Sequence, residues 1–85
     1  MKYVFVDKSW EDYLYWQKTD RKILLKINDL LKDISRTPFV GIGKPEPLRF
    51  KYRGYWFRRI DHEHRLIYQV REDKILIAKC RFYYD

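Results

Sequence analysis

The segment ILLKINDLLKDI, residues 23–34, carries the clearest structural pattern in the chain. Its apolar residues recur with the 3.6-residue period of an amphipathic helix: Ile23, Leu24, Ile27, Leu30, Leu31 and Ile34. The opposite, solvent-facing side is predicted to hold Lys22, Lys26, Lys32 and Asp33. This helix is predicted to begin near Thr19 or Asp20 and to end before Pro38, since proline cannot continue a helix.

The residues before this helix predict a strand and another helix. Residues 2–6 (KYVFV) are rich in aromatic and β-branched types, which is typical of a strand. Asp7 or Ser9 is then placed to cap a helix, and Ser9 followed by Asp12 resembles a capping box. The apolar side of this first helix has the same helical spacing and contains Trp10, Tyr13 and Leu14, with Gln17 beside them.

The residues after the second helix predict a loop and then a sheet. Residues 37–47 hold all three prolines and two of the three glycines, which favours an irregular loop. Beyond it the apolar period changes to two, and we predict strands over residues 49–51, 55–60, 64–70 and 74–83. The chain is therefore predicted to be α+β, with an N-terminal strand and two helices packed on one face of an antiparallel sheet. We find no linker or repeat, so residues 1–85 are predicted to form one domain.

The composition points to anionic partners. Nineteen Lys and Arg residues against 12 Asp and Glu give a net charge of +7, which favours nucleic acid or an acidic protein as the partner. A chain of 85 residues buries too little for an internal cavity, so any chemistry is expected on an open face or groove. No apolar run is long enough for a bilayer and no signal peptide is visible, so we expect a cytoplasmic protein without a membrane partner.

Cysteine and histidine indicate neither a metal nor a cofactor. Cys80 is the single cysteine and lies in an alternating apolar segment, where a small buried side chain is favoured over a nucleophile. His62 and His64 alternate as they would on one face of a strand. Two imidazoles without further ligands make a poor metal site, so we predict none.

The segment GKPEPL, residues 43–48, is the first candidate for chemistry. Its two prolines restrict the backbone and hold Glu46 on a stiff segment, beside Lys44 and within a basic chain. A rigidly held carboxylate among cations suits a general base that acts on a polyanion. A second interpretation is a proline-stiffened connector whose glutamate faces water.

Cations and aromatics alternate through the predicted sheet. Arg58 and Arg59 are adjacent in one strand, so one of them must face away from the core. Neighbouring strands and the Pro-Glu-Pro segment are predicted to bring further cations beside Glu46: Arg49, Lys51, Arg53, Arg65 and Arg81. The aromatic residues among them suit stacking on unpaired RNA bases: Tyr52, Tyr55, Trp56, Phe82, Tyr83 and Tyr84. Alternatively, each arginine pairs with a surface acid and most of the aromatics lie in the core.

Several segments together resemble the YoeB family of bacterial toxins, within the RelE group of toxin–antitoxin ribonucleases. They span nearly the whole chain: SWEDYLYWQ (9–17), KINDLLKDI (26–34), RTPFVGIGKPEPL (36–48), WFRRI (56–60) and EHRLIY (63–68). The resemblance implies a RelE-like microbial RNase fold and a metal-independent endoribonuclease. Such an enzyme cuts mRNA in the ribosomal A site through attack of the 2′-hydroxyl, leaves a 2′,3′-cyclic phosphate and inhibits translation.

The resemblance also assigns roles to residues. It implies that Glu46 is the general base, that Arg65 stabilises the charged phosphorane, and that Arg49 and Arg59 hold the scissile phosphate or the flanking backbone. Tyr84 matches the family's near-terminal tyrosine. Where the family ends in His-Tyr, this chain has Tyr83-Tyr84-Asp85, so we predict that Tyr83 takes the place of the histidine as proton donor or orienting group for the leaving 5′-oxygen. Lys44 and Arg81 are predicted to be additional RNA-binding cations.

Partners follow from the same resemblance and from the charge. We expect a cognate antitoxin with an acidic segment that folds on binding, together with the ribosome, mRNA and possible homodimers. The alternative is a module that has lost its chemistry through Tyr83 and only binds RNA, the ribosome or the antitoxin.

Overall fold

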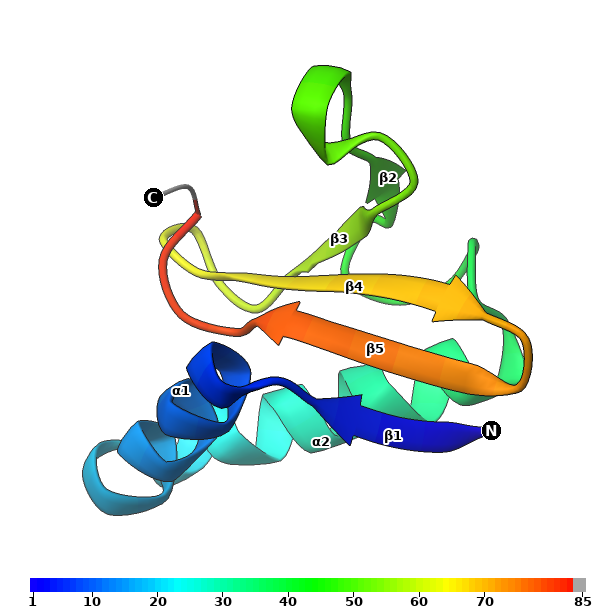
Figure 1. Cartoon of the computed structure of the whole chain (residues 1–85). Coiled ribbons are helices and arrows are strands. Elements are labelled where there is room, and N and C mark those ends of the chain that lie inside the picture. Colours follow the sequence, from blue (N-terminus) through cyan, green and yellow to red (C-terminus); the bar gives the residue numbers. More distant parts are fainter. Residues whose placement is uncertain (84–85) are drawn as a thin grey trace.

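The computed structural model describes residues 1–83 and is drawn in Figure 1. Two helices lie on one side of a five-stranded sheet. The elements, in chain order, are β1 (Lys2–Phe5), α1 (Asp7–Thr19), α2 (Arg21–Arg36), β2 (Glu46–Pro47), the 3₁₀ turn η1 (Phe50–Tyr52), β3 (Trp56–Arg59), β4 (Arg65–Arg71) and β5 (Lys74–Lys79). No helix within residues 1–83 has the length and apolar character needed to cross a bilayer.

The strand order is β1-β5-β4-β3-β2. The pairs β2–β3, β3–β4 and β4–β5 are antiparallel, whereas β1 runs parallel to β5, with Phe5 opposite Ile77. The α+β architecture with both helices on one face is thus confirmed. The sheet is mixed, however. The chain leaves β1 at one edge, forms α1 and α2, and enters the sheet again at β2, the opposite edge; the antiparallel strands then lead back to β5, beside β1 (Figure 1).

Helix α2 supplies much of the core. Five of the six residues in its predicted apolar stripe are buried: Leu24, Ile27, Leu30, Leu31 and Ile34. They belong to the same core cluster as Leu66, Tyr68, Ile75 and Ile77 of the sheet. Of the two predicted starts, Asp20 is the cap, because its carboxylate accepts a hydrogen bond from the Ile23 amide at 3.2 Å.

Helix α1 begins differently from the prediction. Its cap is Val6, and the predicted Ser9–Asp12 capping box is wrong. The Ser9 hydroxyl accepts a hydrogen bond from the Val6 amide and lies 2.6 Å from the Ile77 carbonyl oxygen. The Asp12 carboxylate accepts from the Cys80 amide at 3.0 Å and pairs with Lys8. Both polar side chains are buried because they bind the backbone of β5 and its end.

The chain after the proline-rich loop also departs from the predicted strands. Residues 49–51 do not form a strand, because Phe50 has a φ of +59° and starts the turn η1. The edge strand is Glu46–Pro47 instead, where the missing amide of proline is tolerated. Strand β5 ends at Lys79 and does not reach residue 83, because the next amide bonds to Asp12 and Phe82 has a φ of +63°.

The face of the sheet opposite the helices carries a second, smaller apolar cluster. Leu48, Phe57 and Ile67 are buried in it. Tyr52, Tyr55, Ala78 and Tyr83 pack around them. Residues 48–55 and the segment after β5 therefore cover part of this face, and a groove remains beside them.

Candidate active site

The groove on the open face of the sheet is the candidate site. We call it the Glu46 groove, with a volume of about 460 Å³ and these lining residues: Glu46, Pro47, Leu48, Arg49, Phe50, Phe57, Arg59 and Tyr83. Four of the eight predicted site residues are among them, and they come from three segments of the chain. The fold thus gathers one carboxylate, two guanidinium groups and a phenol around one opening.

Glu46 is presented by the edge of the sheet. It pairs with Phe57 across β2 and β3, and just beyond β2 the Leu48 amide donates to the Tyr55 carbonyl at 2.8 Å. The Glu46 side chain remains exposed. The stiff presentation expected from the two prolines is therefore reinforced by strand pairing, and the carboxylate lines the groove.

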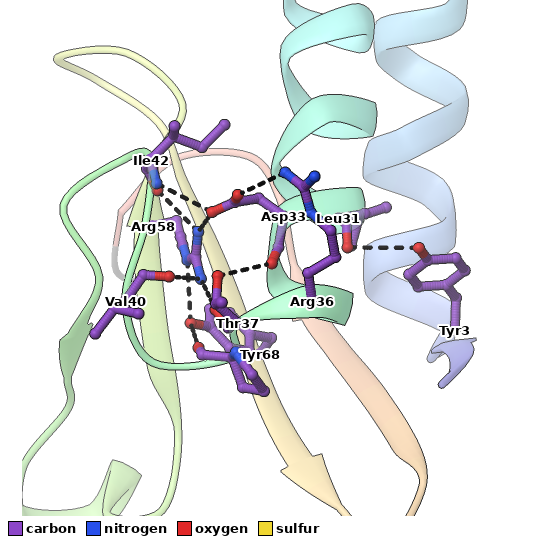
Figure 2. Close-up of polar contacts among 10 residues, drawn as sticks. Tyr3, Leu31, Asp33, Arg36, Thr37, Val40, Ile42, Arg58 and Tyr68 are labelled. Carbon is purple, nitrogen blue, oxygen red and sulfur yellow. Dashed lines mark hydrogen bonds and ion pairs between the residues drawn. The ribbon is translucent and has the colours of Figure 1, made fainter.

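Arg58 anchors the loop that leads to Glu46 (Figure 2). Its side chain is fully buried, with an ion pair to Asp33. The same guanidinium donates to the carbonyls of Thr37 at 2.7 Å, Ile42 at 3.0 Å and Val40 at 3.1 Å. Of the two adjacent arginines, Arg58 thus faces the core and binds the loop. The prediction that Asp33 faces solvent is wrong, because this carboxylate is the counter-charge of the buried guanidinium.

Two further hydrogen bonds complete this anchor. The Tyr68 hydroxyl donates to the Pro38 carbonyl at 2.7 Å, and the Arg59 amide donates to the Gly43 carbonyl at 2.7 Å. Gly41 has a φ of +129°, and a Cβ there would come within 2.0 Å of the Asp33 carboxylate. Residues 37–43 are therefore held against α2 and β3, which fixes the chain just before the Pro-Glu-Pro segment.

The anchor also determines how Asp33 titrates. The hydrogen bond from Arg58 holds the pKa of the Asp33 carboxyl below its usual value of 3.8, against the opposing effect of burial. Hydrogen bonds from the Ile42 amide and from Arg36 lower this pKa further. The carboxylate is therefore ionised in the folded protein at neutral pH and balances the Arg58 charge.

Arg65 lies beneath the groove. It is buried, and its guanidinium donates to the carbonyls of Asp61 at 2.7 Å and His64 at 3.1 Å. Its guanidinium carbon is 4.6 Å from the centroid of the Tyr83 ring and 5.8 Å from that of Phe57. Its Nε is buried and has no hydrogen-bond partner within residues 1–83. Arg65 thus places a buried positive charge directly against two groove-lining rings.

Tyr83 is positioned by the chain just before it. The Phe82 amide donates to Nδ1 of the buried His64 at 2.7 Å, and the Arg65 amide donates to the Phe82 carbonyl at 3.0 Å. The Tyr83 ring meets Phe57 edge-on, with centroids 5.5 Å apart. The sequence pattern did not reveal this role of His64, since the residue that it holds lies 18 positions away.

The remaining predicted residues lie elsewhere. Lys44 is exposed just before the Pro-Glu-Pro segment, and Arg81 stacks on Tyr15 of α1 with its guanidinium carbon 3.5 Å from the ring centroid. Neither lines the groove. Tyr84 falls outside the described residues.

Cys80 is buried, and burial raises the pKa of its thiol to about 12, so it is an inert core residue. Within residues 1–83, no three His, Cys, Asp or Glu side chains cluster as metal ligands would.

Comparison with known proteins identifies the family. The family described as "YoeB-like toxin of bacterial type II toxin-antitoxin system" matches residues 5–84. The chain belongs to this YoeB-like toxin family. It is 57% identical over 84 residues to Toxin YoeB of Escherichia coli strain K12, which covers 99% of this chain and all of that protein. The family resemblance inferred from the sequence is confirmed.

Two solved structures of YoeB proteins from Staphylococcus aureus share the fold. One is a YoeB dimer, with a TM-score of 0.93 and 47% identity, and the match covers 99% of this chain and 98% of that one. The other is a heterotetrameric YoeB–YefM toxin–antitoxin complex, with a TM-score of 0.92, 47% identity and the same coverage. The YoeB fold is therefore the fold of this chain.

Proposed function

We propose that this YoeB-like toxin is a metal-independent endoribonuclease that cuts mRNA in the ribosomal A site and so inhibits translation in the cytoplasm. The observation that carries the proposal is the Glu46 groove, in which a carboxylate, two guanidinium groups and a phenol face one opening. The direct test is primer extension on ribosomes stalled with an empty A site, where cleavage creates a new RNA end within the codon.

In the proposed reaction, Glu46 removes the proton from an RNA 2′-hydroxyl, and the 2′-oxygen attacks the adjacent phosphorus. The bond from phosphorus to the 5′-oxygen breaks, and Tyr83 gives its proton to that oxygen. The products are a 2′,3′-cyclic phosphate and a 5′-hydroxyl. A positioned base and acid contribute about 10²–10⁴-fold each.

Arginine side chains stabilise charge and bind phosphate in the proposed mechanism. Arg65 stabilises the negative charge that builds on phosphorus, and Arg49 and Arg59 hold the phosphate backbone. Fixed positive groups aimed at developing charge often give the largest single contribution to catalysis. Burial of Arg65 supports this role, because a charge shielded from water acts more strongly at a distance. Lys44 and Arg81 remain proposed RNA-binding residues outside the groove lining. Tyr84 remains a proposed catalytic residue.

Tyr83→Phe is expected to lower single-turnover cleavage at least tenfold with little change in ribosome binding, since only the donated proton is lost. Single-turnover rates on ribosomes, with ribosome affinity measured alongside, check this expectation. Cleavage by Tyr83→Phe at the parent rate would remove Tyr83 from the mechanism.

Arg49→Ala and Arg59→Ala are each expected to make RNA affinity less dependent on salt and to weaken binding of all sequences alike. Each phosphate contact to single-stranded RNA contributes a slope of about −0.7 in a plot of log affinity against log salt. Titrations of an unpaired RNA at several salt concentrations measure this slope. Lys22→Ala, on the exposed side of α2, is the matched control. Slopes equal to the parent's in both groove variants would argue against phosphate contact.

We further propose an antitoxin partner with an acidic segment that folds over the Glu46 groove, as well as homodimers. Support comes from the net charge of +7 and from the YoeB–YefM complex and YoeB dimer of S. aureus. Saturation with the cognate antitoxin is expected to abolish cleavage of ribosome-bound mRNA. Full cleavage by the saturated complex would show that the antitoxin leaves the groove open.

One observation favours a second candidate function, a module that binds without cleaving. Tyr83 stands where the family resemblance places a histidine, so the strongest expected proton donor is absent. Such a module would protect mRNA on the ribosome without creating a new end.

A further inference from the structure

Phe50 combines two features that oppose stability. Its side chain is 88% exposed, more than any other large hydrophobic residue within residues 1–83, and its φ is +59°. A bulky residue rarely adopts a left-handed backbone, and an exposed ring gains little from packing. Strained conformations of this kind persist where the surrounding structure enforces them, and they gather at functional sites.

The turn η1 enforces this conformation. The Tyr52 amide donates to the Arg49 carbonyl at 3.2 Å, and the Arg53 amide donates to the Phe50 carbonyl at 3.0 Å. On either side of the ring, Leu48 and Tyr52 pack into the small cluster under the groove. With both neighbours turned inward, the Phe50 ring is fixed outward at the wall of the Glu46 groove.

We propose that Phe50 is a stacking platform for an unpaired RNA base next to the scissile linkage, an inference that rests on the proposed function. Its neighbours determine the class of partner. Arg49, Lys51 and Arg53 flank it in sequence and are all exposed, and Arg49 and Arg59 share the groove with it. An apolar protein surface would leave these charges desolvated, whereas RNA supplies phosphates for the cations and a base for the ring.

The test uses three variants made in a Glu46→Gln background, so that the RNA stays intact. Phe50→Leu keeps an apolar side chain without a π face, Phe50→Trp keeps the π face, and Phe50→Asn suits a left-handed backbone without a ring. The probes are fluorescent oligoadenylate and an abasic ribose-phosphate oligomer of the same length. Binding to the free protein is measured by anisotropy at one salt concentration.

Phe50→Leu and Phe50→Asn are expected to weaken oligoadenylate binding roughly tenfold and to leave abasic binding unchanged, since a stacked base has an energy of this order. Phe50→Trp is expected to bind as the parent does. Phe50→Asn is also expected to unfold at the parent temperature or above it, so its loss of affinity cannot come from a damaged fold.

Equal losses on the two probes, or no loss for Phe50→Leu, would overturn the inference. So would a Phe50→Leu variant that keeps its RNA affinity but binds an antitoxin or a second copy of the chain less tightly, because the ring would then serve a protein interface. The binding assay requires no cleavage, so a failure of the stacking inference can be told apart from a failure of the proposed ribonuclease activity.

Discussion

Glu46→Gln is expected to lower the single-turnover rate of mRNA cleavage on ribosomes by about 10²–10⁴-fold, the range that a positioned base contributes. The amide keeps the size of the side chain and its place in the edge strand but does not accept the 2′-hydroxyl proton. Glu46 is exposed and pairs with β3 only through its backbone, so the fold is expected to be retained. Rates with saturating protein, together with ribosome affinity, separate chemistry from binding.

Glu11→Gln is the matched control for this experiment. It makes the same change of charge at an exposed position on α1, on the helix side of the sheet. It is expected to cleave at the parent rate. Equal rates for Glu46→Gln and the parent protein would exclude Glu46 as the base, and equal losses in both variants would indicate a general effect of charge.

The second large effect is on stability. Arg58→Met is expected to reduce the free energy of unfolding by about 3–5 kcal/mol, the cost of leaving a buried charge without its partner. The change leaves the Asp33 carboxylate without its buried guanidinium partner and removes the hydrogen-bond donor to three loop carbonyls. Small domains are stable by only about 5–15 kcal/mol, so this loss is a large share of the parent's stability and lowers the urea midpoint strongly. Urea unfolding followed by circular dichroism measures the difference.

Arg59→Met is the control, because the same substitution one residue away affects an exposed side chain. Its stability is expected to stay within about 0.5 kcal/mol of the parent's. Equal urea midpoints for the two methionine variants would contradict the role of Arg58.

The lowered pKa of Asp33 also makes the stability of the parent protein depend on pH. A carboxyl group whose pKa is lower in the folded protein than in the unfolded chain stabilises the fold above the unfolded pKa. The parent is therefore expected to lose this part of its free energy of unfolding as the pH falls below about 4.

Sequence periodicity predicted the helices and the core well because local pattern and burial agree there. Helix α2 is the clearest case, since its apolar stripe is the buried one. Asp33 was placed wrongly because its partner Arg58 lies 25 residues away, and only the fold brings the charges together. The adjacent Arg58 and Arg59 in β3 indicated that one arginine faces the core, but the sequence did not show which of the two is buried.

Much of the groove could also be anticipated, because Glu46 and its flanking prolines are neighbours in sequence. The η1 turn could not. Residues 49–51 have strand-like composition, and the backbone at Phe50 is set by the packing of Leu48 and Tyr52 on either side. The burial of Arg65 likewise depends on carbonyls of the β3–β4 turn and on the Tyr83 ring, which no local pattern encodes.

The central claim is that the Glu46 groove cuts mRNA inside the ribosomal A site. Its most direct test is primer extension on initiated ribosomes with an empty A site, with the parent protein and Glu46→Gln side by side. The account predicts a new 5′-hydroxyl end within the A-site codon for the parent protein, and protection of the mRNA without that end for Glu46→Gln. Protection without a new end by the parent protein, or an equal new end with Glu46→Gln, would contradict it.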